Sequence, residues 1–185
     1  ADRETECRMR EIIEERFPDH GIVGEELDPI REDAEYVWLL DPIDGTQSFI
    51  AGVPLFGTLI CLQQNGTPII GVIHQPVLGQ LMIGDGSTTI LNGKPTRMRT
   101  PTILEDAIVL STDERDAKKR FPEDAWDKLT NKAWIYRTWG DCYGYLLLAS
   151  GMADIMIDPI VSSWDFHCML PIIRGAGGII TDDQG

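Results

Sequence analysis

Hydrophobic residues in the first half of the chain form short runs whose spacing changes from that of a helix to that of a strand. Residues 1–17 place apolar side chains near a 3.6-residue period, which predicts an opening helix. Strands are predicted by short apolar runs at 22–26, 37–40, 58–62, 69–73 and 80–83. Asn65-Gly66, between two of these runs, is a strong hairpin signal. We therefore expect a largely antiparallel sheet with helices against it, including a short helix at 49–53 and a turn at 91–95.

In the second half of the chain, predicted strands and helices alternate. Strands are predicted at 107–110, 135–139, 153–158 and 179–180, and helices at 123–132, 141–150 and from 164 onward. Ser162 or Ser163 is the expected cap of the last helix, and Pro171 inside it is expected to kink or shorten it. This alternation predicts an α/β second lobe. We place the boundary near Pro101, which gives lobes 1–100 and 101–185 within one compact unit.

Composition excludes several classes of protein. With 43% hydrophobic and 25% charged residues among 185, the chain has the composition of an ordinary globular protein. A net charge of −14 argues against nucleic acid or an anionic membrane as a partner. The four cysteines form no C-x-x-C pair, and no apolar run approaches 18 residues. We expect free thiols, a cytoplasmic location and no membrane partner.

The apolar run at 37–40 leads into the string Asp-Pro-Ile-Asp-Gly-Thr, which carries the candidate chemistry. Ligands of α/β proteins gather at the carboxyl ends of strands, where this string lies. Asp41 and Asp44, with the carbonyl oxygen of Ile43 between them, offer the oxygen ligands that a hard cation such as Mg²⁺ prefers. The string therefore predicts a metal site.

The last two residues of the same string suit a phosphate group. Gly45 lets the backbone approach a ligand closely, and Thr46 adds a hydroxyl and a free N–H where a helix could begin. Metal and phosphate side by side imply phosphoryl chemistry. Asp, Pro and Gly are also ordinary turn residues, so the alternative is a polar turn after a buried strand.

Three separated motifs resemble the signatures of one family. They are Asp-Pro-Ile-Asp-Gly-Thr at 41–46, Gly-Glu-Glu at 24–26, and Trp-Asp at 164–165 followed by Gly-Ala-Gly-Gly at 175–178. Together they resemble the inositol monophosphatase-like family of Mg²⁺-dependent, typically Li⁺-sensitive phosphatases. The resemblance implies an α+β fold in α-β-α-β-α layers. Family members carry further segments on both sides, so we expect a chain truncated at both ends.

The resemblance also implies roles for individual residues. Two or three Mg²⁺ ions would be held by Glu25, Asp41, the carbonyl of Ile43, Asp44 and Asp165. Paired metals clamp the attacking and leaving oxygens of an in-line displacement. The catalytic residues would be Glu25, Thr46 and Asp2. Glu25 and Thr46 would orient the attacking water, and Asp2 would support Thr46. The N–H groups of Gly45 and Thr46 would hold the phosphate.

Each of the acids outside the central string has an ordinary structural interpretation as well. Asp2 and Asp165 fall in first helical turns, where the helix dipole favours a carboxylate. Glu25 and Glu26 read as surface acids when composition alone is considered. Adjacent strand residues point to opposite faces, so only one of these two glutamates can face Asp41.

Substrate choice is predicted from the string Gly-Asp-Cys-Tyr at 140–143. It is similar to the histidinol-phosphate phosphatase branch, whereas inositol-preferring members have a small, uncharged stretch here. Asp141 would pair with the ammonium or imidazole of L-histidinol phosphate; alternatively, it caps the helix that follows. Asp158 matches an acid that contacts substrate hydroxyls or amine in relatives.

The resulting prediction is a phosphatase of small phosphorylated substrates that acts on L-histidinol phosphate in histidine biosynthesis. A homodimer is a possible assembly. The alternatives within the family are inositol-1-phosphate, a sugar phosphate or a nucleotide 3′-phosphate. A different class of alternative is a non-catalytic protein that keeps the fold to bind a cation or a partner.

Overall fold

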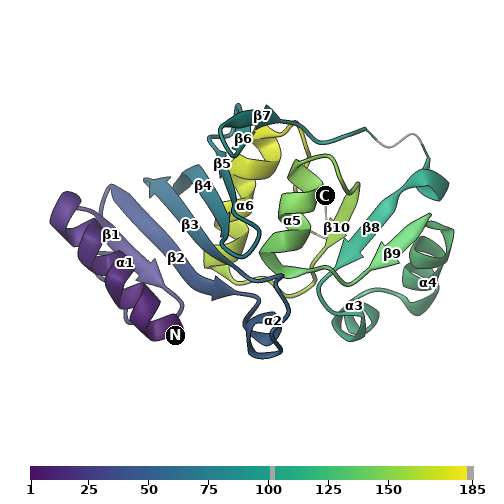
Figure 1. The fold of residues 1–185 in the computed structure, drawn as a ribbon, viewed down its shortest axis with the longest axis horizontal. Coiled ribbons are helices and arrows are strands. Elements are labelled where there is room, and N and C mark those ends of the chain that lie inside the picture. The colour runs from purple at the N-terminus through teal and green to yellow at the C-terminus, as the bar shows by residue number, and fades with distance from the viewer. Residues whose placement is uncertain (101–102, 183–185) are drawn as a thin grey trace.

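The computed structural model describes residues 1–100 and 103–182 (Figure 1). Its helices are α1 Asp2–Arg16, α2 Thr46–Ile50, α3 Glu114–Arg120, α4 Glu123–Lys132, α5 Asp141–Ala149 and α6 Ser163–Gly175, with a 3₁₀ turn at Leu104–Asp106. The strands of the first sheet are β1 Gly21–Gly24, β2 Tyr36–Asp44, β3 Gly57–Gln64, β4 Thr67–Gln75, β5 Gln80–Gly84, β6 Thr89–Leu91 and β7 Lys94–Thr96. Those of the second are β8 Ile108–Ser111, β9 Ile135–Arg137 and β10 Ile155–Ile157.

Helices and sheets alternate in five layers. In the seven-stranded sheet β1 pairs parallel with β2, and the remaining neighbours pair antiparallel. The second sheet has the order β10-β8-β9 and is parallel throughout. Helix α1 packs on the outer face of the first sheet, α5 and α6 lie between the sheets, and α3 and α4 flank the second sheet (Figure 1). The predicted layered α+β fold is confirmed.

Strand β2 is apolar on both faces because a helix covers each of them. Val37 and Leu39 belong to the main core, which also contains buried residues of α5 and α6. Leu40 points the other way and packs with Ile13 of α1 and Ile22 of β1. The period of two along a strand sends alternate residues to opposite faces, so an uninterrupted apolar run results when both faces are buried.

Most predicted elements are present, with shifts at their ends. The Asn65-Gly66 hairpin is confirmed, and both residues have the positive φ that a tight two-residue turn requires, 48° and 75°. Helix α2 begins at Thr46 rather than Phe49. The predicted turn at 91–95 is itself a hairpin between β6 and β7, two three-residue strands too short for periodicity to reveal.

Of the remaining predictions, one strand is absent, one proline does not end its helix, and the lobe boundary is not tested. Residues 179–180 do not form the predicted strand, and Ile179 is 88% exposed. Pro171 lies inside α6, which nevertheless continues to Gly175. The predicted boundary at Pro101 lies outside the described residues, so the division into lobes 1–100 and 101–185 stays a prediction. Within the described residues, no helix combines the length and apolar character needed to cross a membrane.

Helix α6 approaches the first sheet closely because glycines face it. A Cβ on Gly84 would lie 2.7 Å from the backbone oxygen of Pro171 and 2.8 Å from the nitrogen of Ile172. The hydroxyl of Thr89 donates to the carbonyl of Ile172 at 2.6 Å, and the N–H of Gly86 donates to that of Pro171 at 3.0 Å. These contacts fix the height of α6 above the sheet, and with it the position of its first turn.

Gly84→Ala is therefore expected to destabilise the protein by about 1–3 kcal/mol, the usual cost of inserting a methyl group into a packed interface. Urea denaturation followed by circular dichroism measures this. Leu81→Thr is the control, because Leu81 lies three residues earlier on the opposite, exposed face of β5. Equal stability of the Gly84 variant and the parent would contradict this account of the packing.

Candidate active site

An irregularity in β2 places Asp41 and Asp44 on one face of the sheet. Residues three apart in a regular strand point to opposite faces. Here Asp41 pairs with Leu59 and Asp44 with Gly57, so three steps along β2 match two along β3. The extra residue of this β-bulge restores both carboxylates to the face covered by α5 and α6.

Asp165 reaches the same point from the first turn of α6. Oxygen atoms of Asp41, Asp44 and Asp165 all lie within 4.8 Å of one another. The N-cap residue of α6 is Ser162, as predicted, but its side chain makes no capping hydrogen bond. The cluster therefore joins a strand end and a helix start that are more than a hundred residues apart in the sequence.

Glu25 joins this cluster through the parallel pairing of β1 and β2. Gly24 pairs with Leu40, and the N–H of Glu25 donates to the Leu40 carbonyl at 3.1 Å, so Glu25 follows β1 beside Asp41. A hydrogen bond between the Glu25 and Asp41 side chains opposes the rise in the pKa of Glu25 that burial causes. Glu25 and Glu26 are both exposed. The hydrogen bond to Asp41 is what associates Glu25 with the cluster, and its role as a metal ligand stays a prediction.

The pKa values of the clustered acids are raised because like charges gather where water is scarce. Burial, followed by the charges of Asp44 and Asp165, raises the pKa of Asp41 to about 10. Burial and the charges of Asp141 and Asp165 raise that of Asp44 to about 8. Burial raises the pKa of Asp165 to about 6. A divalent cation would reverse all of these shifts by neutralising the charges.

Oxygen atoms without partners give an independent test of whether a cation fits. One carboxylate oxygen each of Asp2, Asp41 and Asp165 is buried and has no hydrogen-bond partner. Buried polar atoms are rarely left unpaired unless a ligand or ion satisfies them. The donor set is entirely oxygen, which suits a hard cation such as Mg²⁺. The residues present therefore fit a metal ion.

The residues predicted to bind phosphate lie next to the acids. Gly45 has φ of 82° and precedes the first residue of α2, Thr46. The Thr46 hydroxyl donates to the carbonyl of Ile43 at 3.1 Å. It is not hydrogen-bonded to Asp2 within the described part of the chain. Asp2 instead lies close enough to Glu25 that its charge contributes to the raised pKa of that residue.

The start of α5 corrects one expectation from the sequence. Gly140, not Asp141, is the N-cap residue, and no side-chain cap bond is formed there. The N–H of Cys142 in the first turn donates to the carboxylate of Asp44, which comes from β2. Asp141 is the first helical residue, with φ of 51°. Its predicted role as a helix cap was wrong, because a more distant carboxylate takes that hydrogen bond.

Asp141 and Asp158 line a pocket of about 390 Å³ beside the acidic cluster. A Cβ on Gly45 would lie 2.9 Å from Oδ2 of Asp141, so the absence of a side chain at Gly45 makes room for this carboxylate. The Thr112 hydroxyl donates to Asp158 at 3.0 Å and accepts from the Asp141 N–H at 3.2 Å. Burial raises the pKa of Asp141, and burial raises that of Asp158 to about 6.

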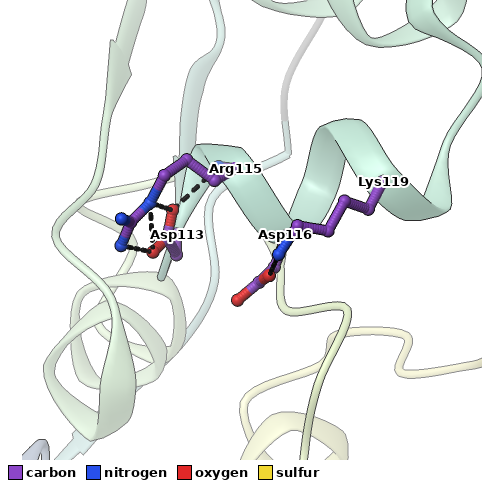
Figure 2. Close-up of polar contacts among 4 residues, drawn as sticks. All are labelled: Asp113, Arg115, Asp116 and Lys119. Atoms are coloured by element: carbon purple, nitrogen blue, oxygen red, sulfur yellow. Dashed lines mark hydrogen bonds and ion pairs between the residues drawn. The ribbon is translucent and has the colours of Figure 1, made fainter.

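Two further acids of the pocket lining are already paired with cations (Figure 2). Asp113 accepts from Nε of Arg115 at 3.1 Å, and hydrogen bonds from Arg115 lower the pKa of Asp113 to about 2. Asp116 accepts from Nζ of Lys119 at 2.7 Å. None of the described lining residues is a lysine or an arginine. The negative charge available to a ligand therefore comes from Asp141 and Asp158.

Sequence reasoning missed several residues that shape this site. Thr112 directly follows β8, and its place after the carboxyl end of a parallel strand was an available signal. The Cys142 N–H could not be anticipated, because its partner is 98 residues away in the chain. Glu6 and Arg10 also went unnoticed, although both are buried beneath Glu25 and its neighbours.

Comparison with known proteins agrees with this geometry. The whole chain, residues 1–185, matches the inositol monophosphatase family. The chain belongs to this family. A histidinol-phosphatase of Chlorobaculum parvum is 39% identical over all of this chain and 72% of its own length. A chloroplastic bifunctional phosphatase of Arabidopsis thaliana is 43% identical, and this chain spans 54% of it.

A solved inositol monophosphatase from Zymomonas mobilis has a TM-score of 0.86 to this chain and is 37% identical, covering 99% of this chain and 71% of its own. The family to which the chain belongs is one of phosphatases, and the acidic cluster is consistent with its metal dependence. The prediction of a phosphatase of this family is thus confirmed, while the roles of single residues stay predictions.

Proposed function

We propose that this protein is a Mg²⁺-dependent phosphomonoesterase that hydrolyses L-histidinol phosphate to L-histidinol and phosphate. The observation that carries this proposal is the pocket beside the acidic cluster. Two of its acids, Asp141 and Asp158, have no ion-pair partner among the described residues and suit a cationic leaving group. Relatives named as histidinol-phosphatases support it. A role in histidine biosynthesis, inhibition by Li⁺ and a cytoplasmic location belong to the same proposal.

The metal ligands in this proposal are the acids that the structure gathers together with one carbonyl oxygen. Glu25, Asp41 and the Ile43 carbonyl would hold one Mg²⁺, and Asp41, Asp44 and Asp165 a second. Ile43 already accepts from Thr46, but a carbonyl oxygen has two lone pairs and can accept a further ligand. When bound, the ions would stabilise the charge that develops on the attacking and leaving oxygens.

The protein's own groups orient the reactants. Glu25 and the hydroxyl of Thr46 would accept hydrogen bonds from the attacking water, and Asp2 would support them from the start of α1. The N–H groups of Gly45 and Thr46 would bind phosphate oxygens. Gly45 adopts its positive φ without the steric cost that a side chain would bring.

Asp141 and Asp158 would bind the ammonium or imidazolium of the substrate. Thr112 connects them, because it donates to one carboxylate and accepts from the backbone of the other residue. A cation beside these carboxylates lowers their raised pKa values and keeps both charged.

Inositol-1-phosphate is the second candidate substrate, favoured by the solved relatives named as inositol monophosphatases. An uncharged polyol could donate to Asp158 and Thr112, but it would leave the charge of Asp141 without a partner. A protein without catalysis is disfavoured, since all four side-chain ligands are present.

A substrate panel tests the proposal. Release of inorganic phosphate is measured from L-histidinol phosphate, inositol-1-phosphate, a sugar phosphate, a nucleotide 3′-phosphate and an aryl phosphate, with Mg²⁺ and with chelator. We expect kcat/KM for histidinol phosphate to exceed the others by more than tenfold and all activity to need Mg²⁺. A preference for inositol-1-phosphate would show that histidinol phosphate is the wrong substrate. If none of the compounds is hydrolysed, the proposal of a phosphatase is wrong.

A further inference from the structure

Helix α1 buries an ion pair in spite of its polar sequence. Glu6 is 0% exposed and Arg10 is 5% exposed, and Nη2 of Arg10 lies 2.7 Å from Oε1 of Glu6. Nε of Arg10 donates to the same oxygen at 2.8 Å. Burying two charges costs more than their mutual attraction returns unless further hydrogen bonds satisfy them. The further hydrogen bonds of Glu6 and Arg10 therefore indicate the role of this ion pair.

All of those remaining hydrogen bonds go to the backbone of one short segment. Oε2 of Glu6 accepts from the N–H of Glu26 at 2.8 Å. Nη1 and Nη2 of Arg10 donate to the carbonyls of Asp28 and Leu27, each at 2.9 Å. The pair thus holds three successive residues that have no regular secondary structure of their own. A planar guanidinium suits this task, because its donors lie in a fixed fork.

The segment held in this way begins directly after Glu25. On its other side Glu25 is fixed to β2, since its N–H donates to the Leu40 carbonyl at 3.1 Å. Gly24 completes the arrangement, because a Cβ there would clash with the Glu6 carboxylate. The peptides before and after Glu25 are consequently both anchored, which leaves its side chain directed at Asp41, its hydrogen-bond partner.

We propose that Glu6 and Arg10 are positioning residues for the metal site, because they fix the 26–28 backbone and thereby hold Glu25 toward the ion. The inference rests on the proposed function in that Glu25 is taken as a ligand. Neither residue would touch substrate or metal. Outer partners that orient a metal ligand typically change affinity 10–100-fold when they are altered.

The test uses Glu6→Gln and Arg10→Lys. The first keeps an acceptor for the Glu26 N–H but leaves the Arg10 charge unpaired, and the second keeps the charge but loses the fork that reaches two carbonyls. Mg²⁺ binding is measured by calorimetry and by the rise in melting temperature that Mg²⁺ causes. We expect affinity to fall at least tenfold in both variants, with kcat at saturating Mg²⁺ within threefold of the parent.

Asp154→Asn is the matched control for lost stability. Asp154 is another buried acid paired with an arginine, Arg99, but it anchors the N–H of Ile108 in the second sheet. Its loss should lower the melting temperature without changing Mg²⁺ affinity. Should Glu6→Gln fail to fold, Arg10→Lys carries the same measurement.

A purely structural role predicts a different result. Variants that melt at lower temperature but bind Mg²⁺ as tightly as the parent would overturn the inference. A loss of kcat at saturating Mg²⁺ with unchanged affinity would overturn it as well. Failure of the proposed function is separately visible, because calorimetry reports Mg²⁺ binding even if the parent hydrolyses none of the phosphate esters.

Discussion

Asp44→Asn is expected to lower Mg²⁺ affinity and kcat/KM by more than about 100-fold, beyond the loss typical for a group one step removed from the metal. Asp44 is close to Asp41 and Asp165, and an amide oxygen offers no charge to a cation. Mg²⁺ calorimetry and phosphate release measure the two losses. Asp124→Asn, which alters an exposed acid paired with Lys128, is the control and should change neither quantity.

The fold of the Asp44 variant should survive, and in the absence of metal it should even gain stability. Asn keeps an oxygen that can accept from the Cys142 N–H, so the start of α5 retains its partner. The change also removes one of the like charges that raise the pKa of Asp41. Thermal melting with and without Mg²⁺ tests this. An unchanged Mg²⁺-dependent rise in melting temperature would remove Asp44 from the site.

The central string could be predicted from local sequence because its chemistry is local. A strand that is apolar on both faces and ends in two acids separated by Pro-Ile indicates a cation site more strongly than a polar turn. The bulge that turns Asp41 and Asp44 to one face follows from pairing with β3, which the string itself does not contain. Residue type therefore predicted two neighbouring acids here, whereas tertiary pairing determined the direction of their carboxylates.

Asp165 illustrates the opposite case. An aspartate in a first helical turn is ordinary, and only the resemblance to a family singled it out. Its position depends on how α6 lies over the glycines of β4 and β5, a contact between segments about 90 residues apart. Periodicity predicts that α6 exists and which face is apolar, but not where its first turn will stop above the sheet.

Glu6 and Arg10 were missed for a related reason. On a helix of mostly charged residues, a glutamate and an arginine four apart read as a surface pair. Their burial arises because the 26–28 backbone folds over them and needs hydrogen-bond partners. An irregular segment gives no periodic signal, so nothing in the helix pattern indicates that it will cover these two side chains.

In the proposed function Asp141 distinguishes histidinol phosphate from uncharged substrates, and its position at the start of α5 allows this role to be tested separately from helix capping. Because the side chain does not cap α5, its replacement should not remove a capping hydrogen bond. Asp141 also has a left-handed φ of 51°, and asparagine tolerates this conformation about as well as aspartate does. Asp141→Asn should therefore leave the melting temperature nearly unchanged and alter mainly the charge that faces the pocket.

Asp141→Asn is expected to reduce kcat/KM for L-histidinol phosphate more than tenfold, which corresponds to at least about 1.4 kcal/mol, within reach of one charge-assisted hydrogen bond. The same variant should hydrolyse inositol-1-phosphate or an aryl phosphate nearly as well as the parent does, since neither brings a cation to this carboxylate. The quantity to measure is the ratio of kcat/KM values for the two substrates in variant and parent. A ratio that does not move would show that Asp141 does not recognise the leaving group, and the substrate would then have to be sought among the uncharged phosphate esters.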